Sequence, residues 1–512
     1  MSDWSHGYVT GVEYDTVFFG VQAPSHLDLV AILTGIEPPE RLGGASYCEL
    51  GCGTGYTLLL FAAANPDIAC WGIDFNPAHI ARARAMQARF GIDNATFLEI
   101  GFDELTGAGA PDLPPFDYVT LHGVYSWVDA AQRDAIRRFL AAAVKPGGLV
   151  YVSYNAMPAW VGAHPLQHLI RELTRRDPNR IDQAVLGAID VARRVAEAGS
   201  PYLDRQWSER VGNLAGQQKT AYLAHEYCNE HWQPFYHHEV AEDLAAAKLS
   251  YIGSAALFEN FVQLCLSPDQ AKLREAAEPR LRETMLDYFL KRSLRLDVFV
   301  KGERRMSAAR QDALVRQVRL ALVVPADKAQ RAFDLSVGRV EFAKELYEPV
   351  YARLGDGPAT VGELLDLPPV SEHGKATGTE FAGILAGSNQ AMPLVVTPDA
   401  AARRRAGRIN RALVEDALTA GAAFTVVVAP ALGTGYRLWL PELLGYRRML
   451  AGAAEDDATI AAIGEECVAR GVTFRTDDGT VIDPATAPER VHEAVRRLLA
   501  HGARLWRTLG LL

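Results

Sequence analysis

The chain has 512 residues, of which 49% are hydrophobic, and its 62 acidic residues outnumber its 52 lysines and arginines, giving a net charge of −10. This length and apolar content predict two or three folded domains. The acidic balance argues against a broad basic surface for DNA or RNA, so nucleic acid is not an expected partner.

Cysteine usage and hydropathy disfavour two further classes of protein. The six cysteines are scattered and form no CxxC pair, so neither a disulfide framework nor a zinc site is indicated. No apolar run approaches the roughly 20 residues that span a bilayer, and the first residues lack the pattern of a signal peptide. We therefore expect a cytoplasmic protein with no membrane insertion and no metal.

Between residues 46 and 155, short apolar runs alternate with helical patterns. The expected strands are 46–50, 70–74, 95–100, 116–122 and 148–155, and the expected helices are 56–64, 77–90 and 130–144. Strands separated by helices at this spacing predict an α/β fold with a parallel, helix-covered sheet. Ligands bind such sheets beyond the carboxyl ends of the strands.

The rest of the chain changes pattern twice. Residues 161–224 have helical spacing and no strand candidate, which predicts an insertion or lid. A helix and strand follow within 237–257, and a strand-like run at 294–302 could complete the sheet. The expected regions are a catalytic domain at 1–160, the insertion at 161–224, a regulatory region at 225–305, and a mainly helical domain at 306–512 for substrate docking or dimerisation.

The first expected strand runs into a glycine-rich loop. Glycines at 51, 53 and 55 permit a sharp turn and a close approach of the backbone to a ligand. A dinucleotide fingerprint would place its third glycine where Tyr56 stands. Glu49 suits the cationic amino group and sulfonium of S-adenosylmethionine better than a pyrophosphate. The candidates for cofactor binding here are Glu49, Gly51, Cys52, Gly53 and Gly55.

The second expected strand ends in an acid. Asp74 lies 23 residues beyond Gly51, close to the spacing at which a carboxylate reaches ribose hydroxyls. Because Pro77 favours a helix start, Asn76 is the expected N-cap and Asp74 remains the expected ribose ligand. Phe75 and Asn76 join Asp74 as cofactor candidates.

Three later segments continue the series. After the third strand, Gly101-Phe102-Asp103 offers an acid for the adenine amino group beside an aromatic wall. The fourth strand ends at His122-Gly123, where the methionine part of the cofactor is expected. The run 145–148, KPGG, predicts a tight turn into the fifth strand.

These motifs resemble those of class I S-adenosylmethionine-dependent methyltransferases, which have a Rossmann-like sheet. The segments LHGVYSWV, SYNAMPAW and YLAHEYCNEHWQPFYHHEV are similar to bacterial methyltransferases that carry a methyltransferase regulatory domain. That group includes the lysine methyltransferases of rickettsial outer-membrane proteins. The resemblance implies S-adenosylmethionine as cofactor, a protein substrate, and a winged-helix-like C-terminal region.

Candidates for the acceptor side follow strands four and five. Tyr154 and Asn155 end the fifth strand, where a class I enzyme meets its acceptor, and with His122 they are the catalytic candidates. The alternative roles are packing in the core for Tyr154 and closing a turn for Asn155. Candidate substrate contacts are Tyr125, Trp127, Tyr154, Trp160, His225, Glu226 and Trp232.

Histidines and carboxylates concentrate between residues 225 and 239. Their spacing lacks the HExxH pattern of zinc hydrolases, and His237 and His238 cannot both face one ion easily. Ordinary hydrogen-bonded structure is the leading interpretation, and a general base or substrate-gating role is the alternative.

Three functions remain open. The leading hypothesis is a protein methyltransferase that acts on lysine, and its rival is a small-molecule methyltransferase with the insertion as a lid. The third is a C-terminal nucleic-acid-binding module, for which the arginine run at 403–411 is the only dense candidate. A solvated helix face explains that run equally well.

Overall fold

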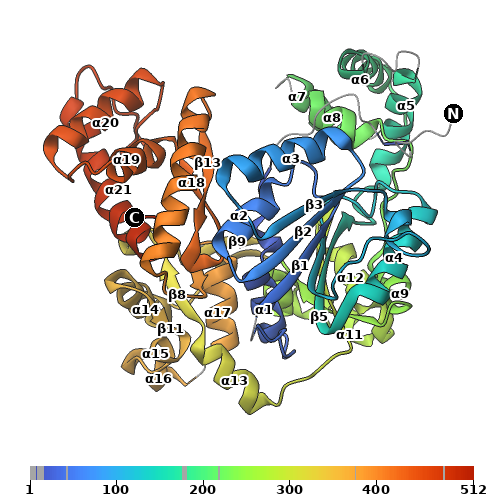
Figure 1. Cartoon of the computed structure of the whole chain (residues 1–512), viewed down its shortest axis with the longest axis horizontal. Coiled ribbons are helices and arrows are strands. Elements are labelled where there is room, and N and C mark those ends of the chain that lie inside the picture. Colours follow the sequence, from blue (N-terminus) through green and yellow to red (C-terminus); the bar gives the residue numbers. More distant parts are fainter. Residues whose placement is uncertain are drawn as a thin grey trace.

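The structure is a computed structural model that describes residues 7–8, 17–41, 44–175, 181–203, 205–216, 220–374, 376–476 and 479–512. Its centre is a seven-stranded sheet with the order β3-β2-β1-β4-β5-β7-β6 (Figure 1). The strands are β1 (Ala45–Leu50), β2 (Ile68–Asp74), β3 (Ala95–Glu99), β4 (Phe116–Leu121), β5 (Val144–Asn155), β6 (Leu249–Ser254) and β7 (Leu294–Lys301).

Strands β1 to β5 are parallel, whereas β7 is antiparallel to both β5 and β6. The predicted α/β, Rossmann-like sheet is therefore confirmed, and the region after residue 225 supplies its last two strands. Because β1, β2, β4 and β5 run in one direction, their carboxyl ends meet at one edge of the sheet.

Helices cover both faces of the sheet. Helices α1 (Pro24–Leu33), α2 (Tyr56–Ala64) and α3 (Pro77–Phe90) pack on one face, and α4 (Ala130–Ala143) and α9 (His237–Ala245) pack on the other (Figure 1). Asn76 caps α3 as predicted, because its side chain accepts a hydrogen bond from the amide of Ala78.

Helix α2 is apolar on all sides, and nearly all of it is buried. The hairpin of β13 (Phe424–Ala429) and β14 (Thr434–Trp439) packs against α2 on the side away from the sheet, and the Tyr56 hydroxyl donates to the carbonyl of Val426 at 3.2 Å. A helix that is hydrophobic all round needs cover on both sides. The C-terminal half supplies that cover.

A helical insertion follows β5 and lies beyond the carboxyl ends of the strands (Figure 1). Its helices pack on one another through their own buried cluster. They are α5 (His164–Thr174), α6 (Ile181–Glu197), α7 (Arg205–Gly216) and α8 (Thr220–Tyr227).

The region between β6 and β7 holds α10 (Val262–Cys265), α11 (Pro268–Ala276) and α12 (Arg282–Phe289). The C-terminal half has two cores. The helices of the first core are α13 (Ala308–Gln317), α14 (Lys344–Asp356), α15 (Val361–Leu365), α16 (Pro368–His373) and α17 (Gly378–Gly387). Its strands are β8 (Arg319–Leu322), β9 (Ala332–Leu335), β10 (Gly338–Glu341), β11 (Ala359–Thr360) and β12 (Ala391–Leu394), which form the sheets β11-β8-β12 and β10-β9. The second core contains the β13–β14 hairpin and the helices α18 (Ala400–Thr419), α19 (Leu440–Leu450), α20 (Asp457–Ala469) and α21 (Pro488–Leu509).

Two expectations about the fold need refinement. The run KPGG lies inside β5, where Gly147 has a φ of +81° and the register with β4 shifts, so it forms an irregularity in the strand and not a turn before it. The domain expected to be mainly helical at 306–512 also contains strands, and β8 to β12 have only two to four residues each, too few for a recognisable strand pattern.

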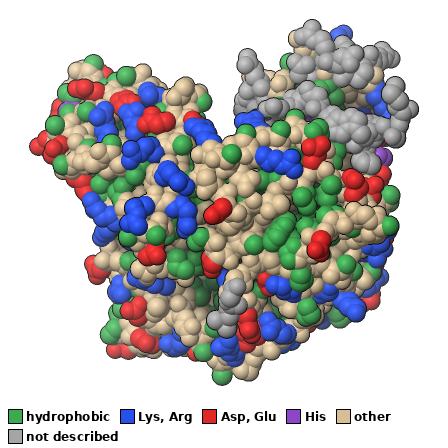
Figure 2. Space-filling view, viewed as in Figure 1, with side chains coloured by type: hydrophobic (Ala, Val, Ile, Leu, Met, Phe, Trp, Pro, Cys, Tyr) green, Lys and Arg blue, Asp and Glu red, His purple; other side chains and the backbone are tan. Residues whose placement is uncertain are grey.

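The arginine run lies on α18, and Figure 2 shows lysine and arginine side chains gathered over this helix. Arg403 donates to the carbonyls of Arg507 and Leu512 at 2.8 Å each, and Arg408 donates to that of Phe90 at 3.0 Å. These two arginines hold parts of the chain together. Nucleic-acid binding by this region stays an alternative hypothesis.

Among the residues that the structure describes, no helix has the length and apolar character needed to cross a bilayer.

Candidate active site

A cavity of about 440 Å³ opens at the carboxyl ends of β1, β2, β4 and β5. It brings together many of the predicted residues from separate parts of the chain. Those that line it are Glu49, Gly51, Cys52, Gly53, Asp74, Phe75, Phe102, His122, Gly123, Trp127, Asn155, Trp160, His225 and Glu226. The cofactor motifs and the acceptor candidates thus share one cavity.

The glycine loop and Asp74 form one hydrogen-bonded unit at this edge. One carboxylate oxygen of Asp74 accepts from the amide of Gly53 at 2.9 Å, and the other accepts from the amide of Asn76 at 2.9 Å. Gly53 has a φ of +53°, and a Cβ built there would meet nothing within 4 Å. The loop therefore presents bare backbone to the cavity, with a carboxylate fixed beside it.

Glu49 is a buried carboxyl in the wall of the cavity. Burial, together with the neighbouring Asp74 carboxylate, raises the pKa of Glu49 to about 8. Its Oε2 atom has no hydrogen-bond partner among the described residues. A buried carboxylate oxygen without a donor suits a cationic group such as an amine, as the sequence predicts for the cofactor's amino end.

A smaller recess of about 40 Å³ adjoins the cavity. Phe75, Gly101, Phe102 and Trp127 line it together with Tyr8, and its walls are largely aromatic. The same four aromatic residues also line the main cavity, so they offer ring faces next to the ribose candidate Asp74. Asp103, predicted to accept from the adenine amino group, is exposed and lines neither this recess nor the main cavity.

His122 and Gly123 follow β4 at the floor of the cavity. The ring of His122 packs on Phe19 with centroids 3.7 Å apart, and its Nδ1 lies 2.8 Å from the Tyr151 hydroxyl. Desolvation lowers the pKa of His122 to about 4, so the imidazole is neutral near pH 7. The amide of Gly123 donates to Ser153 Oγ at 2.8 Å. Both residues lie where the methionine part of the cofactor is expected.

The opposite end of the cavity is built by β5, β7 and α8. Asn155 is buried, and its side-chain Nδ2 has no partner within the described part of the chain. Trp160 donates from Nε1 to the carbonyl of Ser293 at 2.6 Å. His225 and Glu226 reach the cavity from α8, so this end combines an aromatic ring, an amide and a carboxylate.

Some predicted residues do not line the cavity, and each has a structural role instead. Gly55 starts α2 with a φ of +70°, and Asn76 caps α3. The Tyr154 hydroxyl donates to Asp297 at 2.5 Å on the other face of the sheet. The Tyr125 hydroxyl donates to Asp243. Trp232 packs edge-on against Trp160 with centroids 5.4 Å apart, so it supports the wall from behind.

The histidine-rich run separates into unrelated places. His225 and Glu226 line the cavity, whereas His237 contacts Asp297 at 3.0 Å and His238 contacts Thr284 at 3.1 Å. Glu239 accepts from the amide of Tyr236 at 2.8 Å and caps α9. In the described parts of the chain, no group of three histidines, cysteines or carboxylates could hold a metal ion.

Sequence analysis missed several lining residues. They are Tyr8, Val17, Phe19, Thr54, Tyr56, Thr57, His79, Val124, Val128, Tyr222, Asn229, Ser293 and Leu294. Aromatic residues occur repeatedly ahead of the first strand, but the place of Tyr8 and Phe19 in this cavity depends on tertiary packing. Tyr8 contacts Phe75 and His225, with ring centroids 6.1 Å and 5.5 Å apart, so it connects the aromatic recess to α8.

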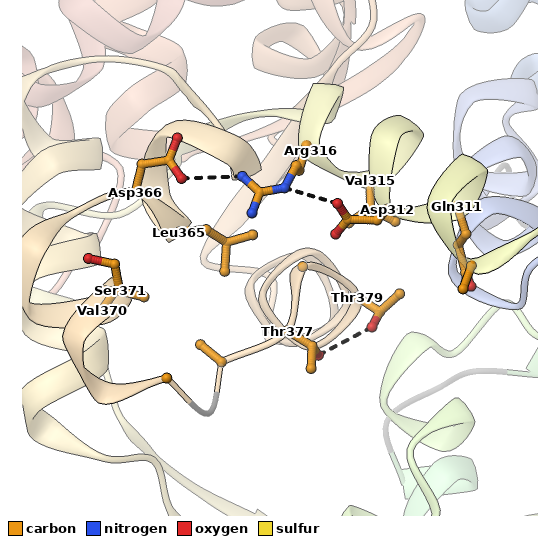
Figure 3. Close-up of a pocket in the computed structure, with 14 residues that line it drawn as sticks. Gln311, Asp312, Val315, Arg316, Leu365, Asp366, Val370, Ser371, Thr377 and Thr379 are labelled. Atoms are coloured by element: carbon orange, nitrogen blue, oxygen red, sulfur yellow. Dashed lines mark hydrogen bonds and ion pairs between the residues drawn. The ribbon is translucent and has the colours of Figure 1, made fainter.

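A second cavity, of about 520 Å³, lies in the C-terminal half between α13 and the segment α15–α17 (Figure 3). Arg316 crosses it and binds Asp312 at 3.1 Å and Asp366 at 3.3 Å. None of the predicted site residues lines this cavity.

Two regions of the chain match known protein families. Residues 48–150 match the family model "Methyltransferase domain", and residues 219–301 match "Predicted methyltransferase regulatory domain". An uncharacterized protein from Synechocystis is 36% identical over 364 residues, which are 70% of this chain and 71% of that protein. An uncharacterized protein from Rickettsia prowazekii is 27% identical over 238 residues, 45% of this chain and 91% of that one.

A solved structure resembles this fold over nearly the whole chain. The structure of PKMT2 from Rickettsia typhi in complex with AdoHcy superposes with a TM-score of 0.68 at 18% sequence identity. The superposition covers 97% of this chain and 99% of that chain. At this identity, the likeness shows a shared fold that extends through the C-terminal half.

Proposed function

Because this chain belongs to the S-adenosylmethionine-dependent methyltransferases that carry a methyltransferase regulatory domain, we propose that it methylates a protein on the amino group of a lysine side chain. The observation that carries this proposal is that an aromatic ring, Trp160, and a carboxylate, Glu226, both line the acceptor end of the cofactor cavity. An aromatic wall accommodates the apolar stem of lysine, and a carboxylate attracts its cationic head.

The same end of the cavity suits the chemistry of transfer. The cofactor supplies a methyl group on a sulfonium, which is already a good leaving group, so the protein mainly aligns the acceptor with it. A lysine amine must attack in its neutral form, although its pKa in water is about 10.4. Enclosure among Trp160, Tyr222 and Leu294 lowers the pKa of an entering amine, and the carboxylate of Glu226 can take its proton.

We assign the cofactor's contacts to the other end of the cavity. Asp74 binds the ribose hydroxyls, Glu49 binds the amino group, and the glycine loop approaches the cofactor with its backbone. Phe75 and Phe102, which line the main cavity as well as the recess, stack on the adenine ring. This assignment uses the unpartnered Oε2 of Glu49 and the open space beside Gly53.

Tyr8 tests the adenine end of this assignment. Replacing it in Tyr8→Ala removes ring contacts that are worth about 0.5–1.5 kcal/mol each, so we expect the Kd for S-adenosylmethionine to rise up to about tenfold. Tyr8→Phe keeps the ring and should bind within about twofold of the wild type. Isothermal titration calorimetry measures both, with the exposed Tyr202→Ala as control. Equal affinities for Tyr8→Ala and the wild type would place the adenine elsewhere.

The acceptor is tested directly with cofactor that carries a labelled methyl group. The protein is incubated with a cell lysate, which is then separated into protein, RNA and metabolite fractions. We expect label in the protein fraction and, after complete hydrolysis, in methylated lysine. Helix α8 covers the cavity and would also suit a small acceptor, so label confined to the metabolite fraction would replace the lysine proposal with a small-molecule one.

Glu226→Gln examines the role of the carboxylate. Loss of a charge-assisted contact costs roughly 1.5–3 kcal/mol, so we expect kcat/KM for the lysine acceptor to fall at least about tenfold. The Kd for S-adenosylmethionine should stay within about twofold. Glu197→Gln, which removes an exposed carboxylate on α6, is the matched control. An unchanged kcat/KM in Glu226→Gln would exclude this residue from acceptor binding.

A further inference from the structure

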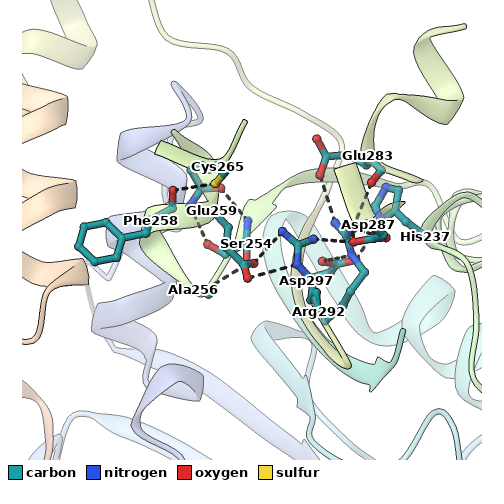
Figure 4. A network of polar contacts seen from close by, with 12 residues as sticks. His237, Ser254, Ala256, Phe258, Glu259, Cys265, Glu283, Asp287, Arg292 and Asp297 are labelled. Atoms are coloured by element: carbon teal, nitrogen blue, oxygen red, sulfur yellow. Dashed lines mark hydrogen bonds and ion pairs between the residues drawn. The ribbon is translucent and has the colours of Figure 1, made fainter. Parts of the chain in front are cut away.

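Behind the acceptor end of the cavity lies a buried network of charged side chains (Figure 4). Its centre is Asp297 on β7, which is fully buried. Asp297 accepts from Arg295 Nε at 2.9 Å and from the Tyr154 hydroxyl at 2.5 Å, and it lies 3.0 Å from Nδ1 of His237. Three elements, β5, β7 and α9, therefore meet on one carboxylate.

The network continues into α12. Arg295 donates through Nη1 to both oxygens of Asp287 at 2.8 Å, and Asp287 also binds Arg292 at 3.0 Å. Burial alone would raise the pKa of Asp297, but the adjacent Arg295 guanidinium outweighs it and holds this pKa well below its usual range. The carboxylate is thus charged at every physiological pH, and its partners are fixed around it.

This network is the reverse side of the acceptor wall. In the antiparallel pair of β5 and β7, Tyr154 lies opposite Arg295 and Asn155 lies opposite Leu294. Successive side chains of a strand point to opposite faces of the sheet. Tyr154 and Arg295 accordingly join the network, whereas Asn155 and Leu294 line the cavity.

The backbone connects the two faces at the same point. The carbonyl of Ser293 accepts from the amide of Ala156 at 3.0 Å and from Trp160 Nε1 at 2.6 Å. A shift of β7 against β5 would move Leu294 and Trp160 together, because both depend on this register. The network fixes the register from the other side of the sheet.

We infer that Asp297 is a positioning residue for methyl transfer: through Tyr154 it fixes the end of β5 against β7 and so sets the place of Asn155 at the acceptor. The region matched as a regulatory domain then has a direct part in the reaction, since it supplies residues of the acceptor wall, among them Glu226 and Leu294. This inference rests on the proposed acceptor site but not on lysine as the acceptor.

The test compares two buried tyrosines that each lose only a hydroxyl. Tyr154→Phe removes the hydrogen bond to Asp297 and keeps the ring in place. Tyr446→Phe, the control, removes a hydroxyl that donates to the carbonyl of Leu511 at 3.0 Å in the C-terminal half. For both variants, kcat and the acceptor KM are measured with the acceptor that takes label from the wild type, alongside the Kd for S-adenosylmethionine and the Tm.

We expect Tyr154→Phe to lower kcat about tenfold while its cofactor Kd stays within about twofold, and Tyr446→Phe to keep a wild-type kcat even if its Tm falls. Asp297→Asn should lower kcat at least as far as Tyr154→Phe where it folds. A folded Tyr154→Phe with wild-type kcat would overturn the inference. A wild type that labels only metabolites would instead refute the lysine proposal, and the same comparison then proceeds with that acceptor.

Discussion

Asp74→Ala is expected to abolish measurable binding of S-adenosylmethionine at cofactor concentrations that saturate the wild type. The carboxylate orders the loop through the amides of Gly53 and Asn76 and, in our assignment, also binds the ribose. Hydrogen bonds to a charged group contribute roughly 1.5–3 kcal/mol each, so the loss of two or more predicts a decrease in affinity of a hundredfold or greater.

Calorimetric titration with S-adenosylmethionine and with its demethylated product measures this loss. The matched control is Asp67→Ala, which removes an exposed carboxylate just before β2 and should leave both affinities unchanged. Asp74→Asn keeps the size of the side chain but loses its charge, and we expect an intermediate affinity. Unchanged binding in a folded Asp74→Ala would refute our placement of the ribose.

Glu49→Gln is expected to change stability and binding in opposite directions. The folded pKa of Glu49, about 8, lies above its unfolded value of 4.5, so its contribution to stability is full below pH 4.5 and is lost as the pH rises to 8. Glutamine does not titrate. The variant without cofactor should therefore be more stable than the wild type at pH 9, by at most roughly 5 kcal/mol, with the difference vanishing near pH 4.

Urea denaturation of the cofactor-free protein across this pH range measures the stability difference, with the exposed Glu99→Gln as control. At pH 7.5 a bound cationic amino group favours the ionised form of Glu49 despite the raised pKa of this residue, and glutamine cannot form that ion pair. We therefore expect Glu49→Gln to bind S-adenosylmethionine about tenfold or more weakly at this pH. A purely structural role would lower both stability and affinity. A variant that gains no stability at pH 9 would contradict the raised pKa.

Local signals explain what could be predicted from the sequence. Helix α3 spans Pro77–Phe90 as expected, because a cap and a proline mark its start and Gly91 marks its end with a φ of +62°. The cofactor end of the cavity follows from the sheet, since β1, β2 and β4 each deliver the residues that follow them to the same edge. The bounds of α3 and the residues that follow each strand can be predicted because they depend on residues close by in the sequence.

Residues brought in by tertiary packing could not be predicted in the same way. Tyr8 and Phe19 reach the cavity from a segment ahead of the first strand, and Ser293 is the residue directly before β7. The joint assignment of Tyr154 and Asn155 to the acceptor site ignored alternation along a strand, which sends neighbours to opposite faces. That error was avoidable from the sequence, whereas the buried partners of Tyr154 were not.

The packing of the β13–β14 hairpin on α2 affects which fragments of the protein can fold. A fragment that stopped after β7 would retain every strand of the large sheet, but it would expose to water the surface of α2 that β13 and β14 cover. Since α2 begins at the glycine loop, such a fragment would lose the ordered loop as well as its solubility. We therefore expect the catalytic sheet to fold together with the β13–β14 hairpin, which lies more than a hundred residues beyond the end of β7.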